Sequence, residues 1–243
     1  MAADEYDSPG GSQSALRRSN QRKILDVLRR TGPTSQAALA RTCGLSRSAV
    51  NVIIRSLSAD GLVAVTAGVN GRETEVALVT TTGAVLAIDL GHRRLHGVLF
   101  DFESKRRRDE VVDLGGSHEA QTDVEAVARL VDRLLDRGGV SRDDVLSVCV
   151  ALHAPYESIS HRISGSGIWP GWRGLDVEGT LRERLALPVI VDNDANLAAL
   201  AEWTWGPGRG ADELLYAKCA NGIGSGLVLG GRIFGGSNGM AGE

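Results

Sequence analysis

Residues 34–57, TSQAALARTCGLSRSAVNVIIRSL, contain two short helical patterns that meet at Gly44. Glycine readily adopts the left-handed backbone conformation that a sharp helix exit requires. Ser35 and Ser46 each stand where one of the helices is expected to begin. Their hydroxyl oxygens suit an N-cap because they accept a hydrogen bond from a free backbone N–H of the first turn. The stretch therefore predicts two helices joined by a tight turn.

The second of these helices has two distinct faces. Its apolar residues recur at helical spacing and predict a core-facing stripe: Ala49, Val50, Ile53, Ile54 and Leu57. The other side carries four polar or cationic residues: Arg47, Ser48, Asn51 and Arg55. Such a face after a glycine turn is typical of a recognition helix that enters a DNA major groove. The alternative is an ordinary helical hairpin whose polar face is solvated.

The flanking residues extend this pattern to a complete DNA-binding domain over residues 16–80. A first helix is expected from Asn20, and two short strands are expected at residues 62–66 and 75–79. A glycine-rich connection between the strands suits a hairpin. Three helices and a hairpin predict a winged helix–turn–helix. Arg72 at the hairpin tip is a candidate for contact with a phosphate or the minor groove, or a solvated turn cation.

Charge is distributed unevenly along the chain. The 243 residues carry a net charge of −3, yet residues 16–58 hold nine Arg or Lys against one acid, Asp26. A basic block on an otherwise acidic chain indicates a polyanionic partner for that block alone. Residues 1–15 are polar and predict a disordered tail rather than a signal peptide. With no apolar run long enough to cross a membrane, we expect a cytoplasmic protein without a membrane partner.

Residues 81–243 follow a different pattern, in which strands alternate with helices. This alternation predicts an α/β domain. Asp89-Leu90-Gly91 ends one strand, and an aspartate and glycine there suit a Mg²⁺–nucleotide site. Residues 221–226, NGIGSG, form a second glycine-rich turn that can hold phosphate or serve only as a tight connection. Residues 192–196, DNDAN, can bind a polyhydroxyl ligand, or can merely cap the following helix.

Three longer segments together resemble the ROK family of repressors, open reading frames and sugar kinases. They are LAIDLGHRRLHGVLFD at 86–101, WPGWRGLDVEGTLRERLALPVIVDNDANLAALAE at 169–202, and GIGSGLVLGGRIFGGSNGMAGE at 222–243. Their order and spacing both match. The resemblance implies an actin-like, ribonuclease H-like ATPase fold, so that the whole chain resembles a ROK transcriptional regulator. In such regulators this domain senses a sugar or sugar phosphate and controls the affinity for DNA.

The resemblance also implies roles for individual residues. Asn193, Asp194 and Glu243 match the sugar-binding positions, and Asp194 is the catalytic base in the kinases. Asp89 and Gly91 match the first phosphate motif, and Gly222 and Gly224 match the second. These carried-over positions are Asp89, Gly91, Asn193, Asp194, Gly222, Gly224 and Glu243.

The chain departs from the family pattern in three places, one of which is Ile168, where an Asn is common before the Pro-Gly-Trp turn. His92 and Arg93 stand where the kinases have Gly-Thr, and bulky residues there are expected to crowd an approaching phosphate. The His and Cys zinc cluster of the family falls beyond Glu243, so the chain is expected to be incomplete at its C-terminus and to hold no metal. His92 has no second ligand at metal-binding spacing, and a surface histidine is the preferred interpretation.

These observations favour a DNA-binding transcriptional regulator, most simply a repressor, that responds to a sugar or sugar phosphate. Its expected partners are an inverted-repeat operator in double-stranded DNA, the small effector and a second copy of the chain. No cofactor and no enzymatic activity are expected. Two alternatives remain: a sugar kinase with an accessory DNA-binding domain, and a winged-helix protein whose sensor domain binds no ligand and serves for dimerisation.

Overall fold

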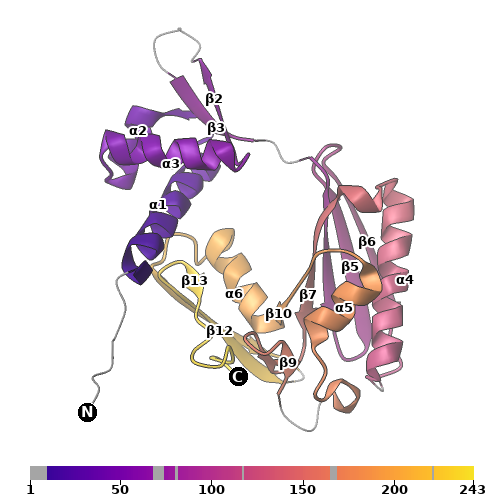
Figure 1. The fold of residues 1–243 in the computed structure, drawn as a ribbon. Helices are drawn as coiled ribbons and strands as arrows, with labels where there is room; N and C mark the ends of the chain where they lie inside the picture. Colours follow the sequence, from indigo (N-terminus) through magenta and orange to yellow (C-terminus); the bar gives the residue numbers. More distant parts are fainter. Residues whose placement is uncertain (1–9, 68–73, 80–81, 117, 165–168, 221) are drawn as a thin grey trace, which may run out of the picture. The chain divides into compact units, whose positions relative to one another are not determined.

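A computed structural model describes residues 10–67, 74–79, 82–116, 118–164, 169–220 and 222–243 (Figure 1). The chain divides into two compact units, Met1–Thr80 and Thr81–Glu243. No helix among the described residues is long and apolar enough to cross a membrane.

The first unit packs three helices against a small antiparallel sheet of order β1-β3-β2. Its elements are α1 (Gly10–Thr31), β1 (Thr34–Ser35), α2 (Gln36–Cys43), α3 (Arg47–Ala59), β2 (Val63–Ala67) and β3 (Thr74–Leu78). Ile24 of α1, Leu39 of α2, Ile54 of α3 and Val76 of β3 are all buried in one core. With Val63 of β2, the three helices and the two longer strands therefore all contribute to the same small hydrophobic cluster.

Side-chain and glycine caps fix the junction between α2 and α3. The Ser35 hydroxyl accepts a hydrogen bond from the Ala38 amide at 3.3 Å, and Ser46 accepts one from Ala49 at 3.2 Å. Gly44 ends α2 in the left-handed region, with φ of 65°. The Val50, Ile53, Ile54 and Leu57 side chains of α3 are buried as predicted. The helix–turn–helix expected from residues 34–57 is confirmed in these details.

The structure corrects the start of the first helix. We expected α1 to begin at Asn20 after a disordered tail over residues 1–15, but the helix begins at Gly10. The interpretation was therefore wrong for residues 10–15. Each residue added to an existing helix gains a hydrogen bond, so a strong downstream helix extends into a polar segment of modest propensity. Residues 1–9 lie outside the described residues.

We expect the cap at Ser46 to stabilise the first unit. Ser46→Ala removes the acceptor for the Ala49 amide and should destabilise the unit by about 1 kcal/mol. Hydrogen exchange of the α3 amides, measured by mass spectrometry, checks this. Ser58→Ala, at an exposed position near the other end of α3, is the matched control. Equal protection of α3 in the two variants would contradict the capping role.

The second unit begins with a five-stranded sheet of order β10-β7-β4-β5-β6. Within it β4, β7 and β10 run parallel, and β5 and β6 are antiparallel to their neighbours. The helices α4 and α5 pack against each other and against this sheet (Figure 1). The bounds are β4 Ala84–Leu90, β5 Arg94–Asp101, β6 Arg106–Asp113, α4 Ala120–Gly138, β7 Val145–Leu152, α5 Val177–Leu185 and β10 Val189–Asn193.

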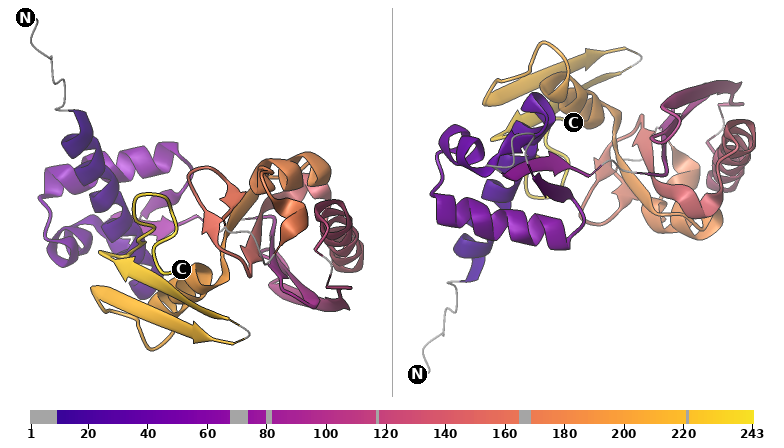
Figure 2. Two further views of the ribbon diagram at one scale, coloured as in Figure 1. Left: turned by 90° about the horizontal axis from the view of Figure 1, so that it is seen from below. Right: turned by 90° about the horizontal axis from the view of Figure 1, so that it is seen from above.

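A second sheet follows, in which β11, β12 and β13 are antiparallel neighbours. The helix α6, which leads directly out of β10, packs on β11 and β12 (Figure 2). The bounds are α6 Asp194–Thr204, β11 Glu213–Cys219, β12 Ile223–Leu229 and β13 Arg232–Ile233. The remaining short elements of the unit are β8 Tyr156–Glu157, β9 Arg162–Ile163, η1 Arg142–Asp144 and η2 Pro170–Trp172.

The extent of the second glycine-rich turn also needs correction. We expected residues 221–226 to form a turn, but β12 begins at Ile223, and Lys218 of β11 pairs with Gly224. Gly226 is in the strand because α6 passes close to it: a Cβ there would lie 2.5 Å from the Ala195 carbonyl oxygen. The turn itself is thus shorter than predicted, and Gly226 serves the packing of the strand against α6.

The parallel register determines which residues meet at the edge of the first sheet. Asp89 of β4 and Asp192 of β10 both pair with Ala151 of β7. The carboxyl ends of the three strands therefore lie together, followed by the loop residue His153 and by Asn193 at the end of β10. Ligand sites of open α/β sheets form at such an edge.

Candidate functional site

The exposed face of α3 is the candidate DNA-binding surface. Four polar residues on this helix point away from the buried stripe and are exposed: Arg47, Ser48, Asn51 and Arg55. Ser46 caps the helix, and its hydroxyl lies 3.0 Å from that of Ser48, so the first turn is held at the start of this face. The predicted arrangement of the four residues is therefore present, and their contact with DNA stays a prediction.

One residue of this face escaped the sequence interpretation. Val52 is 56% exposed on the side of α3 that carries the four polar residues. The sequence did contain a signal for this, because position 52 does not belong to the helical repeat formed by the buried residues of α3. An exposed aliphatic group on a recognition helix suits contact with a thymine methyl group. Arg72, the predicted contact at the hairpin tip, lies outside the described residues.

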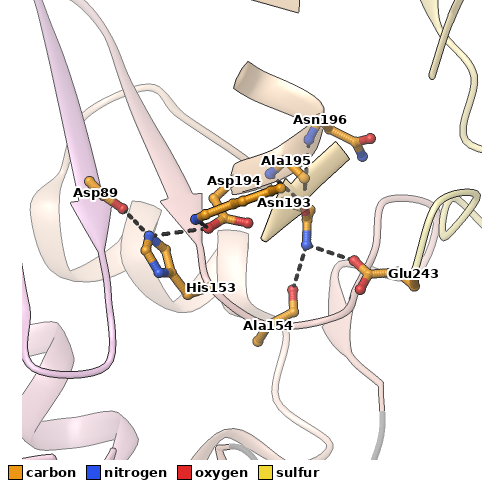
Figure 3. Close-up of polar contacts among 9 residues, drawn as sticks. Asp89, His153, Ala154, Asn193, Asp194, Ala195, Asn196 and Glu243 are labelled. Atoms are coloured by element: carbon orange, nitrogen blue, oxygen red, sulfur yellow. Dashed lines mark hydrogen bonds and ion pairs between the residues drawn. The ribbon is translucent and has the colours of Figure 1, made fainter. Parts of the chain in front are cut away.

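The candidate sugar site is built around Asn193 at the end of β10 (Figure 3). Its side-chain oxygen caps α6 by accepting hydrogen bonds from the Ala195 amide at 2.7 Å and the Asn196 amide at 3.4 Å. Its Nδ2 donates to the Ala154 carbonyl at 3.2 Å and to Glu243 Oε1 at 2.6 Å. Asn193 thus caps the helix, as one interpretation of the DNDAN segment expected, and also donates to a carboxylate of the candidate site, while its contact with a sugar stays a prediction.

Glu243 comes to the site from the far end of the chain. The segment before it is held to β12, because the backbone amide and the hydroxyl of Ser225 donate to the Gly242 carbonyl at 2.8 and 2.9 Å. Desolvation of its carboxyl group raises the pKa of Glu243, and the negative charge of Asp194 adds to this effect. Burial likewise raises the pKa of Asp192, opposed by its hydrogen bonds from Asn196 and the Asn193 amide.

Asp194, the candidate base of a kinase, is held by two further residues that the sequence interpretation missed. The Lys218 ammonium group of β11 contacts its Oδ2 atom. Nε2 of His153 lies 3.2 Å from the same oxygen and 2.5 Å from Oδ1 of Asp89 (Figure 3). Asp89 and Asp194, assigned to separate motifs, are therefore joined by one imidazole ring.

His92 is placed differently from the surface histidine that we expected. Its ring packs edge-on against His118 and Trp169, with centroid separations of 5.3 and 6.4 Å. Burial lowers the pKa of His92, and the neighbouring His118 and His153 lower it further. Its side chain is thus engaged in an aromatic cluster, and the exposed Arg93 beside it forms no part of that cluster.

The residues of the two phosphate motifs lie at strand ends. Gly91 is buried after β4, Gly222 is exposed just before β12, and Gly224 is within β12. The Gly91 amide already donates to the Arg94 carbonyl at 3.0 Å. Within the part of the chain that the structure describes, no group of three or more His, Cys, Asp or Glu residues is arranged to hold a metal ion. Because His153 contacts both Asp89 and Asp194, and the Gly91 amide is already bonded, the donor set around Asp89 does not fit a metal–nucleotide complex.

Comparison with known proteins identifies both units. The family model "ROK family" matches residues 85–243, and the model "Winged helix-turn-helix DNA-binding" matches residues 17–64. Since the first match covers more than half of the chain, the protein belongs to the ROK family. The predicted fold class, a winged helix–turn–helix followed by a ROK domain, is confirmed.

Individual relatives include regulators and kinases. A xylose repressor of Bacillus spizizenii is 24% identical over 95% of this chain and 60% of its own length. A glucokinase of Halalkalibacterium halodurans is 51% identical over 73 residues, which are 30% of this chain and 22% of the glucokinase. This chain therefore spans about 60% of the length of the xylose repressors that it matches.

Solved structures give the same two classes. A ROK family transcriptional regulator, described as a homologue of the E. coli MLC protein, superposes with a TM-score of 0.72 at 20% identity, over 94% of this chain and 58% of the regulator. A Streptomyces griseus ROK glucokinase solved with glucose and AMPPNP gives 0.57 at 25% identity, over 66% and 49%. The regulator match extends over both units.

Proposed function

We propose that this chain is the DNA-binding and sensor part of a transcriptional repressor whose affinity for DNA responds to a sugar. The observation that carries the proposal is the exposed polar face of α3 within a winged helix–turn–helix. Arg47 and Asn51 lie one turn apart near the start of that helix, which is the part that reaches base edges in helix–turn–helix complexes. Arg55 further along is placed for phosphate, and Arg72 is proposed to contact DNA from the hairpin. The similarity to xylose repressors supports the repressor assignment.

The proposed effector is a sugar or sugar phosphate held at the end of β10. Asp194 and Glu243 offer carboxylate oxygens to hydroxyl groups, and Asn193 orients Glu243. The proposed operator is an inverted repeat, because helix–turn–helix proteins that act as dimers read two half-sites related by symmetry. The domain boundaries proposed are residues 16–80 for DNA binding and 81–243 for the sensor.

Binding-site selection from random duplexes, followed by fluorescence anisotropy, tests the proposal. We expect an inverted repeat to be enriched and bound more tightly than random DNA. Adding pentoses, hexoses and their phosphates one at a time should then change the affinity for the repeat with one sugar only. If no sequence is enriched over the starting pool, the regulator assignment fails.

A second candidate, a sugar kinase with an accessory DNA-binding domain, is favoured by the local similarity to a glucokinase. We predict no phosphorylation, because phosphoryl transfer requires base, metal and phosphate groups in position together. Here Lys218 and His153 both contact Asp194, and His153 also contacts Asp89. A coupled assay with ATP, Mg²⁺ and a panel of hexoses measures this. Turnover that disappears in Asp194→Asn would establish the kinase instead.

A further inference from the structure

His153 lies between the two carboxylates that a metal–nucleotide complex would need. It follows β7, and its Nε2 atom is 2.5 Å from Asp89 Oδ1 and 3.2 Å from Asp194 Oδ2 (Figure 3). Ionised carboxylate oxygens only accept hydrogen bonds, so Nε2 must carry a hydrogen. That nitrogen cannot at the same time coordinate a metal ion. The imidazole therefore stands between the two acidic side chains, donating to Asp89 and lying next to Asp194.

The same ring covers the glycine of the first phosphate motif. A Cβ atom built on Gly91 would lie 3.4 Å from Cε1 and 3.5 Å from Nδ1 of His153. The Gly91 amide is also used, since it donates to the Arg94 carbonyl at 3.0 Å. A phosphate group approaching Gly91 would thus meet the His153 ring instead of a free amide. His92, which we expected to crowd this position, packs against His118 and Trp169 instead.

The charge of Asp194 is balanced within the protein as well. Lys218 contacts Oδ2, the oxygen that also faces His153. A carboxylate that already faces a cation gains less from a metal ion. The other side of the site differs, because the carboxyl group of Glu243 faces uncharged donors, Nδ2 of Asn193 and the backbone of Tyr156.

We infer that His153 is a specificity-determining residue, which closes the metal–nucleotide side of the site and leaves the side formed by Asn193 and Glu243 for a ligand. This inference rests on the proposed sensor site. His153 takes the place that a divalent cation would have between Asp89 and Asp194, and its ring covers Gly91. The side chains of Asp89 and His153 are 50% and 28% exposed, so removing the ring opens a position that an ion in solution can reach.

Mn²⁺ binding, followed by electron paramagnetic resonance and by calorimetry, tests this inference on the whole chain. We expect His153→Ala to bind Mn²⁺ about tenfold or more tightly than the unchanged protein, since Asp89 loses its donor and Asp194 keeps only the contact with Lys218. Addition of ADP should then increase the fraction of Mn²⁺ that is bound to the His153→Ala variant. It should not do so for the unchanged protein. His96→Ala is the matched control, because His96 faces a single carboxylate, Asp109, at 3.8 Å. It should leave Mn²⁺ binding unchanged.

Two further variants make the result specific. Asp89→Asn on the His153→Ala background should remove the gained Mn²⁺ affinity, and His153→Ser replaces His153→Ala if the latter does not fold. Unchanged Mn²⁺ affinity in a folded His153 variant, or equally tight binding by the unchanged protein, would overturn the inference. Sugar binding by the unchanged protein is measured separately by calorimetry. Gain of Mn²⁺ binding without any sugar binding would keep the role of His153 and refute the sensor function.

Discussion

Replacing Asn51 by Ala is expected to weaken binding to the preferred operator by on the order of 1–3 kcal/mol, or roughly five- to 150-fold. Asn51 is exposed on α3, one turn beyond Arg47, and opposite the buried stripe of the helix. An asparagine amide in the major groove both donates to and accepts from an adenine edge, and alanine can do neither. The loss should therefore be confined to the preferred sequence.

Fluorescence anisotropy with the selected operator and with random DNA measures both affinities. Arg29→Ala is the matched control, since this exposed cation of α1 is placed for phosphate at most and should weaken both DNAs alike. A uniform loss with Asn51→Ala, similar to that with Arg29→Ala, would show that α3 does not read bases. In that case the polar face of α3 would be a solvated surface or a backbone contact only.

The parts of the fold that follow from local signals were predicted well. Ser35, Gly44 and Ser46 act within four residues of their own positions, so their capping roles could be derived from the sequence. The two-residue strand β1 was missed because it exists only through pairing with β3, about 40 residues away. The early start of α1 was missed because helix propagation depends on the stability of the downstream segment.

The candidate site was predicted only in part, for a similar reason. Asn193 and Asp194 stand together in the sequence, and Glu243 was assigned from the family resemblance. His153 and Lys218 carry no local signal, since their contacts are created by the order of the strands. A clue to His153 was available: it directly follows a buried strand, and parallel neighbours place their carboxyl ends at one edge. The sequence did not reveal that β7 lies next to β4.

Asn193→Ala is expected to have the largest effect on the second unit. The change removes the cap of α6 and leaves the Ala154 carbonyl and Glu243 without their donor. Losing the cap and leaving the buried Ala154 carbonyl without a donor should together destabilise the unit by about 2 kcal/mol or more. Sugar binding should fall with it, because Glu243 would lose the donor that orients its Oε1 atom.

Asn193→Ser separates the two roles of this residue. Serine keeps an oxygen that can cap α6 but has no amide group to reach Glu243. Urea unfolding followed by tryptophan fluorescence reports on the second unit, since all four tryptophans follow residue 168. We expect the serine variant to retain most of the stability that the alanine variant loses, while calorimetry shows sugar binding weakened in both. If the serine variant binds sugar as tightly as the unchanged protein, then Asn193 serves only as a helix cap, and the orientation of Glu243 does not determine sugar affinity.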